Sequence, residues 1–511
     1  MNMKNIKKIF CGSLVLLLAS CSPQVTTTNY YFDPVNGDDT NKGTTVQTPF
    51  KSLTKLTQLA FKGGDSILLK SGAVFTEKLY LSCSGEENNP IVLGKYGGTE
   101  KPHVKGNGVD TATVHIFNSE NLVIRDIEIS NKGNAPKAGL FGLWVELDKF
   151  GESHNLSIDN LYIHDVYGST VIEKGGGMGM CIQNGRDTDS IFNRFIGMNI
   201  ENCYIKDCQR DGIKFRGYWT RNQWNPNLKV VVRNNVIDGV PGDGIVPVGC
   251  DGALVEYNVM KNCPKTLPES EACDGIWPWC SDNTIVQFNV VSDHKSIIDG
   301  YAYDSDWGCK NSVFQYNLSY NNDGGFMLVI GTDGWPKDWC VNGNIETKVR
   351  YNVSINDGLR NYLTNASHKD AYFCPAMHFT GYTQNTLVEN NLFYLFPKPE
   401  PQIDRTLFHF TQHDSSYGKG DVFRNNYIYA PEVTVAVKEE KAVDNQYLGN
   451  VYIGNLQTPA TGFTKHEGPF DKSLWYNAED KNWDILLDFL KDKTVPINGK
   501  ELKVLDIIGA N

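Results

Sequence analysis

Three aspartates in residues 299–306 are the first candidates for chemistry: Asp299, Asp304 and Asp306. Carboxylates at this spacing can coordinate a hard cation, and calcium is the ion that we would expect there. They can also hold and release protons as a general acid and a general base. Hydrolysis of a glycosidic bond needs two such carboxyl groups, one protonated and one ionised. Asp243 and Asp274, each followed by glycine, belong to the same candidate set.

A basic pair, Lys214 and Arg216, offers a different chemistry. β-Elimination on a uronic acid requires a base and a cation that neutralises the substrate carboxylate. Arg216 has the planar fork that clamps a carboxylate, and Lys214 can serve as the base or as a second cation. His294, shortly before Asp299, is a candidate for proton transfer. Together these residues favour elimination.

Tryptophans are concentrated in the same part of the chain, because seven of the ten lie in residues 219–339. Flat apolar rings stack on the C–H faces of sugar rings, so this concentration predicts a sugar-binding groove. We expect Trp277, Trp279 and Trp307 to bind the substrate there. Arg360 lies further along the same predicted face and is a fourth binding candidate.

A repeated motif predicts the elements that must position these residues. An asparagine between β-branched or aromatic residues recurs along the chain, at positions 235, 258, 289, 317, 352, 391 and 426. The intervals run from 23 to 39 residues, which suits one turn of a solenoid with loops of variable length. The period-two alternation predicts short strands that bury their apolar face by stacking. We therefore expect an all-β, right-handed parallel β-helix of about ten coils, with asparagine amides bonded to their copies above and below.

A second repeat, Asp-Gly followed by an apolar residue, predicts the register of the site. It occurs at Asp211, Asp243, Asp274 and Asp299, and the first three copies are 32 and 31 residues apart. If the apolar residues Ile213, Ile245, Ile276 and Tyr301 face the core, the alternation turns Lys214, Arg216, Trp277, Trp279 and Asp304 outward. The aspartates of this repeat can equally cap the local backbone of a tight turn.

The chain resembles secreted parallel β-helix carbohydrate-active enzymes of the pectate-lyase-like superfamily. Residues 31–39 and 48–53 are similar to the N-terminal cap of those proteins, and residues 299–306 are similar to their acidic calcium-binding stretches. The resemblance implies a capped solenoid. We expect an N-terminal cap and first coils in residues 21–120, the β-helix with its groove in 121–465, and a C-terminal cap in 466–511 with a helix near 483–490.

The first twenty residues predict export. They combine Lys4, Lys7 and Lys8 with an apolar run and a small-residue stretch, which is the layout of a secretory signal. The signal ends at Cys21 and resembles a bacterial lipobox, so we expect lipid attachment at Cys21 on a bacterial membrane, in the periplasm or at the cell surface. Without residues 1–20 the formal charge moves from −11 to −14, which argues against a nucleic-acid partner. Cys203 with Cys208 and Cys273 with Cys280 can form disulfides in that compartment, or lie unbridged inside the coils.

These observations predict a carbohydrate-active enzyme that acts on a uronate-containing polysaccharide or oligosaccharide by β-elimination, as a lyase or a dehydratase. Hydrolysis by paired aspartates is the alternative. A third possibility is a non-catalytic, glycan-binding lipoprotein that uses the tryptophans alone.

Overall fold

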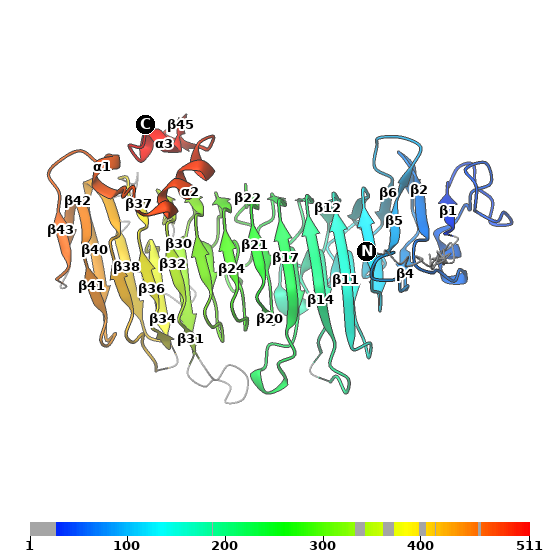
Figure 1. The fold of residues 1–511 in the computed structure, drawn as a ribbon, viewed down its shortest axis with the longest axis horizontal. Helices are drawn as coiled ribbons and strands as arrows, with labels where there is room; N and C mark the ends of the chain where they lie inside the picture. Colours follow the sequence, from blue (N-terminus) through cyan, green and yellow to red (C-terminus); the bar gives the residue numbers. More distant parts are fainter. Residues whose placement is uncertain are drawn as a thin grey trace, which may run out of the picture.

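Long parallel sheets run side by side along the molecule and form the faces of a β-helix (Figure 1). The computed structural model describes residues 27–511 except 187, 333–342, 361–371, 398–404, 414 and 458–460. The predicted signal peptide and Cys21 lie outside the described residues. The predicted parallel β-helix is confirmed.

The first sheet has one strand from almost every coil, and its members pair in parallel. They are β1 (Asn29–Phe32), β2 (Ser66–Lys70), β5 (Ile91–Tyr96), β8 (Leu122–Arg125), β11 (Glu152–Asp159), β14 (Arg194–Glu201), β17 (Asn227–Arg233), β20 (Cys250–Asp251), β21 (Leu254–Glu256), β24 (Ile285–Gln287), β28 (Val313–Gln315), β32 (Lys348–Arg350), β36 (Leu387–Glu389), β39 (Val422–Arg424) and β41 (Gln446–Leu448).

The second sheet carries the candidate site. It runs through β4 (Leu79–Leu81), β7 (Ala112–Phe117), β10 (Leu140–Glu146), β13 (Gly177–Gln183), β16 (Asp211–Arg216) and β19 (Ile245–Val246). Single bridges from Ile245 to Ile276 and from Ile276 to Tyr303 continue it. The later strands are β27 (Tyr301–Ser305), β30 (Gly325–Gly331), β34 (Met377–Gly381) and β38 (Thr406–Thr411).

The third sheet closes the cross-section of each coil. Its strands are β3 (Val74–Phe75), β6 (His103–Gly106), β9 (Glu128–Asn131), β12 (Tyr162–Val166), β15 (Tyr204–Lys206), β18 (Val236–Asp238), β22 (Val259–Lys261), β25 (Val290–Ser292), β29 (Leu318–Tyr320), β33 (Val353–Ile355), β37 (Leu392–Tyr394), β40 (Tyr427–Glu439), β42 (Asn450–Gln457) and β43 (Phe463–Lys465). The long strand β40 pairs with both β37 and β38, so it joins the second and third sheets.

Short elements complete the fold. Two-stranded pairs are β23 (Ala272–Cys273) with β26 (Ile298–Asp299), β31 (Asn344–Ile345) with β35 (Thr383–Gln384), and the antiparallel β44 (Thr494–Ile497) with β45 (Lys500–Lys503). The helices are η1 (Leu53–Gln58), η2 (Ile172–Lys174), η3 (Arg221–Gln223), α1 (Lys472–Trp475), α2 (Lys481–Leu490) and α3 (Val504–Ile507). In the part of the chain that the structure describes, none of these helices is long and apolar enough to cross a membrane.

The predicted asparagine ladder is confirmed. The Asn289 amide donates to Asn317 Oδ1 at 3.1 Å, and Asn258 donates to Asn289 Oδ1 at 3.0 Å. The same contact links Asn235 to Asn258 and continues from Asn317 to Asn450. These amides satisfy buried backbone groups at one corner of every coil, which water cannot reach.

The left-handed residue at this corner is the one before each ladder asparagine. It is Phe288 before Asn289, with φ of 56°, and Tyr316 before Asn317, with φ of 57°. Several of these residues are aromatic, and their rings stack from coil to coil, as Phe288 does on Tyr316 at 5.1 Å. An apolar stripe therefore lies along the outside of the corner.

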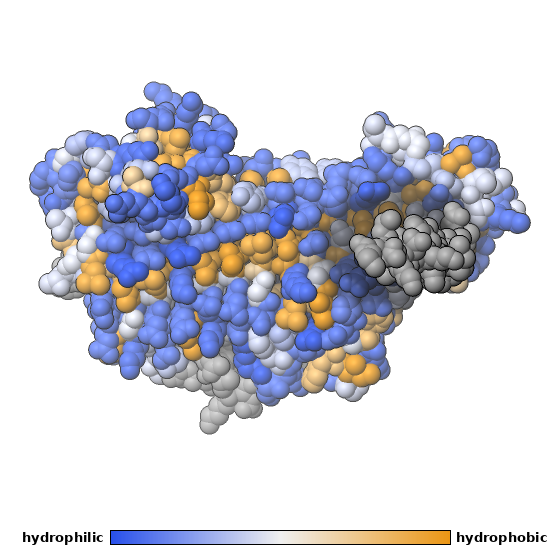
Figure 2. All heavy atoms as spheres, in the orientation of Figure 1, coloured by the Kyte–Doolittle hydropathy of each residue, from blue (hydrophilic) through white to orange (hydrophobic). Residues whose placement is uncertain are grey.

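The C-terminal segment covers this stripe. Helix α2 begins at the N-cap Asp480, whose carboxylate also accepts from the Tyr351 hydroxyl at 2.5 Å. Phe489 of α2 contacts Phe288 with ring centroids 5.5 Å apart, and Trp483 is buried against Tyr351. Figure 2 shows apolar side chains gathered where this segment meets the solenoid. The helix therefore packs along the side of the coils and not over the end of the last one.

Candidate functional site

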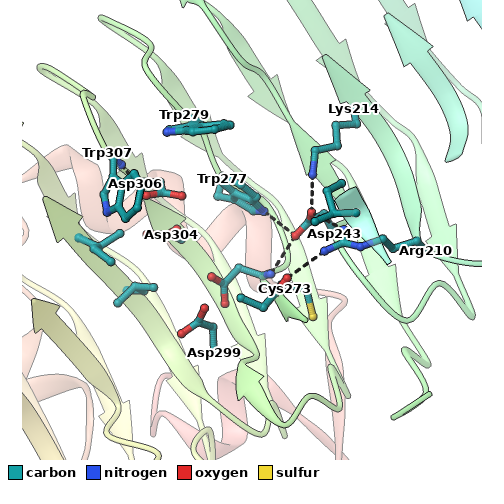
Figure 3. A pocket seen from close by; sticks show the side chains of 15 residues that line it. Arg210, Lys214, Asp243, Cys273, Trp277, Trp279, Asp299, Asp304, Asp306 and Trp307 are labelled. Atoms are coloured by element: carbon teal, nitrogen blue, oxygen red, sulfur yellow. Dashed lines mark hydrogen bonds and ion pairs between the residues drawn. The ribbon is translucent and has the colours of Figure 1, made fainter. Parts of the chain in front are cut away.

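A pocket of about 340 Å³ opens on the second sheet, where β16, β23, β26, β27 and β30 meet (Figure 3). It contains carboxyl groups from several neighbouring coils, three tryptophans and two cations. Its lining consists of Ile172, Arg210, Lys214, Asp243, Ala272, Cys273, Asp274, Trp277, Trp279, Asp299, Asp304, Asp306, Trp307, Leu328 and Ile330.

The Asp-Gly repeat sets the register of this sheet for three coils. Ile213 pairs with Ile245, and Ile245 pairs with Ile276, as predicted. The fourth copy is displaced, because Ile276 pairs with Tyr303 and not with Tyr301. Cys273 already pairs with Asp299, one residue out of the repeat, and the second residue of the shift arises at Gly300, which has φ of 74° and separates β26 from β27.

The shift determines where Asp299 lies. Cys273 and Asp299 pair across β23 and β26, at the edge of the pocket. Asp304 projects from β27, and Asp306 follows its end. Three coils of the second sheet thus contribute carboxyl groups to one pocket.

Asp243 is held ionised. Its Oδ2 accepts from Lys214 Nζ at 2.7 Å and from Arg210 Nη1 at 2.9 Å, and its Oδ1 accepts from Trp277 Nε1 at 3.1 Å. Burial alone would raise the pKa of Asp243, but Lys214 and Arg210 hold it well below its usual range. The two cations of the pocket are therefore engaged with an internal carboxylate.

The other carboxyl groups have raised pKa values. Burial and the charge of Asp299 raise the pKa of Asp274 well above its usual range, and burial and Asp306 do the same for Asp304. Burial raises the pKa of Asp299 to about 6 against the opposing charge of Arg360. Burial, together with Asp299, raises the pKa of Asp306 to about 7. Asp299 and Asp306 are thus the two that change protonation near neutral pH.

The same carboxyl groups also differ in their hydrogen-bond partners. Asp274 Oδ1 accepts from the Tyr301 backbone N–H at 2.6 Å, and Asp306 Oδ1 accepts from the Trp307 N–H at 2.5 Å. Asp304 Oδ1 is buried without a partner among the described residues. Figure 3 shows Asp299 and Asp306 on opposite sides of Asp304, with the pocket in front of them.

The three predicted tryptophans all line the pocket, in different settings. Trp277 is buried beside Lys214, whose Nζ lies 5.6 Å from the ring centroid. Trp279 is partly exposed and stacks on Trp219 with centroids 5.3 Å apart. Trp307 is also partly exposed. Trp279 and Trp307 therefore present ring surface to a ligand, whereas Trp277 mainly orients Asp243.

Three predicted site residues lie outside the pocket lining. Arg216 donates to the Gly175 carbonyl at 3.0 Å, and its guanidinium lies over the Phe141 ring. His294 is fully buried, with Nε2 3.6 Å from Cys273 Sγ, and burial lowers its pKa. Arg360 is also buried and donates to backbone carbonyls, among them Phe373 O at 2.7 Å. The alternation along a strand predicts on which side of the sheet a side chain lies, but it does not predict the neighbouring segments that pack against that side chain.

Arg210 is a site residue that the sequence analysis missed. It contacts Asp243, Asp211 and Glu271, and so it gathers the charges of three coils. Its position directly before the first Asp-Gly was a signal that could have identified it. A second cavity, of about 790 Å³, shares Asp299 and Leu328 with the pocket and extends it toward His378 and His409.

The three aspartates expected to bind calcium do not place their carboxylate oxygens close together. Within the described residues, only one group of three His, Cys, Asp or Glu side chains places a ligand atom of each within 4.8 Å of the others, and it lies elsewhere. Asp299, Asp304 and Asp306 share the pocket without forming such a group, and calcium binding stays a prediction. The ten described cysteines are buried and form no disulfide with one another, so Cys203 is not bridged to Cys208, nor Cys273 to Cys280.

Fold and site together define a parallel β-helix protein with an acidic, tryptophan-lined pocket on one of its sheets. No family model matches the chain. A lacto-N-biosidase of Bifidobacterium longum subsp. longum is 26% identical to it over 424 residues, which are 65% of this chain and 26% of that protein. The chain thus spans about a quarter of the length of this relative.

Solved structures show the same fold. The GH136 lacto-N-biosidase from Eubacterium ramulus superposes with a TM-score of 0.57 and 21% identity, over 84% of this chain and 67% of that one. The pectate lyase Pel9A gives a TM-score of 0.37 at 13% identity, over 75% of this chain and 79% of that one.

The expectation of β-elimination is wrong. The sequence relative is a lacto-N-biosidase, which is a glycosidase and not a lyase. The geometry agrees, since Lys214 is paired with Asp243 and Arg216 points away from the pocket. Both cations therefore already have partners within the protein, and a uronate would have to compete with them. The comparisons favour the alternative, hydrolysis.

Proposed function

We propose that the protein is a glycoside hydrolase whose Asp299 and Asp306 carboxyl groups act as the catalytic pair on an oligosaccharide. The observation that carries this proposal is the position of these two carboxyl groups in one pocket, where burial and neighbouring charges raise their pKa values to about 6 and about 7. Near neutral pH such a pair holds about one proton between its two members. One protonated and one ionised carboxyl group are what glycoside hydrolysis requires.

Their neighbours are poorly suited to either role. Asp243 is kept ionised by Lys214 and Arg210, which both donate to its Oδ2, and its Oδ1 accepts from Trp277, so neither oxygen is left for a proton or a sugar. Asp274 and Asp304 have pKa values raised well above the usual range, so they stay protonated and can donate hydrogen bonds to sugar hydroxyls. The protonated member of the pair gives its proton to the glycosidic oxygen, and the ionised one acts at the anomeric carbon, directly or through water.

The pocket favours an uncharged sugar. Both cations in the described lining are already paired with Asp243, so they are poorly placed to neutralise a carboxylated sugar, which would also meet the ionised member of the catalytic pair. Trp279 and Trp307 offer apolar ring surface that suits the C–H faces of a pyranose. The adjoining cavity beyond Asp299 gives room for further sugar units.

The sequence relative makes lacto-N-biosides the first substrates to test. The proposed test incubates residues 21–511 with an aryl lacto-N-bioside, a panel of uncharged oligosaccharides and a uronate polysaccharide, and measures released sugars by chromatography. We expect release from an uncharged substrate. D299N and D306N should each lower kcat/KM by at least about 100-fold, because each removes a proton-transfer or nucleophilic group. D251N, on β20 and outside the pocket lining, is the matched control and should keep full activity.

Two outcomes would contradict the proposal. Wild-type turnover in both D299N and D306N would show that other groups do the chemistry. Binding of an oligosaccharide that depends on Trp279, without turnover of any substrate in the panel, would favour the non-catalytic glycan-binding protein.

The proposed location is a bacterial membrane surface outside the cytoplasm, with Cys21 as the lipid attachment site. Support comes from the lipobox-like residues 18–21 after an apolar run. Expression of the full chain with labelled palmitate tests this idea. Label should enter the wild-type protein and be absent from C21A, while label retained in C21A would contradict it.

A further inference from the structure

Two histidines and a glutamate meet on the third sheet, on a different face from the pocket. His103 on β6 pairs in register with Glu128 on β9, and His164 on β12 pairs with Ser130, two residues beyond Glu128. Core residues such as Ile129 alternate with them and are fully buried, so these polar side chains point outward. Three consecutive coils thus contribute one side chain each.

The three side chains converge on one oxygen atom. His103 Nδ1 lies 3.4 Å and His164 Nε2 lies 3.1 Å from the same Glu128 Oε1. One ligand atom from each residue lies within 4.8 Å of the others. Each histidine side chain is 16% exposed and the glutamate 28%, so the group is sheltered but open to small solutes.

The outer nitrogen of each imidazole already has a partner. His164 Nδ1 is 2.8 Å from Asp165 Oδ2, and Asp165 in turn accepts from Lys132 Nζ at 2.8 Å. His103 Nε2 is 2.8 Å from the Ser130 hydroxyl. An ionised carboxylate only accepts hydrogen bonds, so Asp165 holds the proton of His164 on Nδ1. This carboxylate–histidine arrangement orients metal-ligating imidazoles in many proteins.

The remaining atoms, His103 Nδ1, His164 Nε2 and Glu128 Oε1, face one another. In neutral His164 the lone pair of Nε2 points at a carboxylate oxygen, which is unfavourable unless a proton or a cation lies between them. A divalent ion would satisfy all three inner atoms together.

We propose that His103 Nδ1, Glu128 Oε1 and His164 Nε2 form a binding site for a divalent transition-metal ion, with zinc as the best match to two imidazoles and one carboxylate. A water molecule completes the coordination on the exposed side. The ion would connect three successive coils near the N-terminal end, so its role is to stabilise the solenoid. The proposal does not depend on the hydrolase activity.

The test uses residues 21–511, freed of metal with a chelator and then supplied with zinc. Zinc retained after dialysis is measured by elemental mass spectrometry, and affinity by competition with a chromophoric chelator. We expect about one bound zinc per chain and a melting temperature that rises with zinc concentration. H103A and H164A should each weaken binding by at least about 100-fold, and D165N, which acts through His164, by about 10-fold.

H154A is the matched control, because His154 also lies beside a glutamate, Glu152, at 3.7 Å but has no second imidazole. It should bind zinc as the wild type does. E128Q keeps the shape and hydrogen-bonding capacity of the glutamate, so it serves if an alanine variant fails to fold. No retained zinc in the wild type, or wild-type affinity in folded E128Q, would overturn the proposal and leave a hydrogen-bonded ladder of side chains.

Discussion

Replacement of Asp243 with asparagine should move the pH dependence of hydrolysis to lower pH. Asp243 is ionised, and its negative charge raises the pKa of both Asp299 and Asp306. Asparagine removes the charge and keeps a side-chain oxygen for the hydrogen bonds from Lys214 and Arg210. The two cations then act on the catalytic pair with one opposing charge fewer, so both pKa values fall.

The size of the shift follows from the place of Asp243 among the charges that act on the pair. A neighbouring charge displaces a buried carboxyl pKa by about 1 to 3 units. Asp299 acts on Asp306 more strongly than Asp243 does, so we expect the low end of this range. One unit corresponds to about 1.4 kcal/mol. The alkaline limb of kcat/KM, which reports loss of the proton from the acid, should move down by about one pH unit, and the acidic limb should follow.

The assay is kcat/KM of hydrolysis from pH 4 to 9 at constant ionic strength, for the wild type, D243N and D211N. Asp211 is the matched control, since it binds the same Arg210 but is not among the charges that act on Asp299 or Asp306. D211N should keep both limbs in place. Loss of a charged partner from a buried hydrogen bond costs about 1.5 to 3 kcal/mol, so unfolding is measured in parallel.

An unchanged profile in folded D243N would refute the reasoning, because the catalytic groups would then be insensitive to the charge beside them. A shift to higher pH would refute it more strongly, since the sign follows from electrostatics alone. Equal shifts in D243N and D211N would indicate a general disturbance of the charge cluster and not the specific coupling that we infer.

Three further predictions concern the binding surface, the ladder and the cysteines. W279A, which removes the partly exposed Trp279 ring, should raise KM about 10-fold with little change in kcat, as measured by initial rates. The reason is that this ring, which stacks on Trp219, offers binding surface to the substrate. An unchanged KM would exclude this ring from the substrate contact. N289A should destabilise the protein by about 3 kcal/mol in chemical denaturation, because it leaves buried backbone groups unpaired. Q315A removes a side-chain contact on the outer surface and should cost below about 1 kcal/mol. Equal losses of stability in the two variants would contradict the role of the ladder. Reducing agent should leave the melting temperature unchanged, because the ten described cysteines are buried and form no disulfide with one another. A clear drop would reveal a disulfide.

The solenoid could be predicted from the sequence because its signal is local and repeated. The asparagine and the alternation of apolar residues recur from coil to coil, and each repeated asparagine has the same surroundings, as the contacts of Asn289 and Asn317 show. The left-handed backbone at this corner is adopted by Phe288 and not by Asn289. Asparagine has the stronger intrinsic preference, but here its amide is engaged in the buried ladder and the preceding residue takes the turn.

The site was predicted in part. Asp304, Asp306, Trp279 and Lys214 do line one pocket, because the Asp-Gly spacing fixed their coils and their side of the strand. The role expected for Lys214, as a base or a cation for a substrate carboxylate, was wrong. The sequence does not show that Asp243, on the next coil, lies 2.7 Å from the Lys214 amino group.

The sequence by itself determined the repeat, the sheet faces and the accumulation of carboxyl groups and tryptophans on one of them, because period and residue type act over a few positions. Tertiary structure alone decided which charges pair, which carboxyl groups remain protonatable and which side chains are covered by loops. A one-residue shift at β26 pairs Asp299 with Cys273 and places it at the pocket edge. Electrostatic coupling depends on distances between coils, and such distances follow from stacking and loop packing.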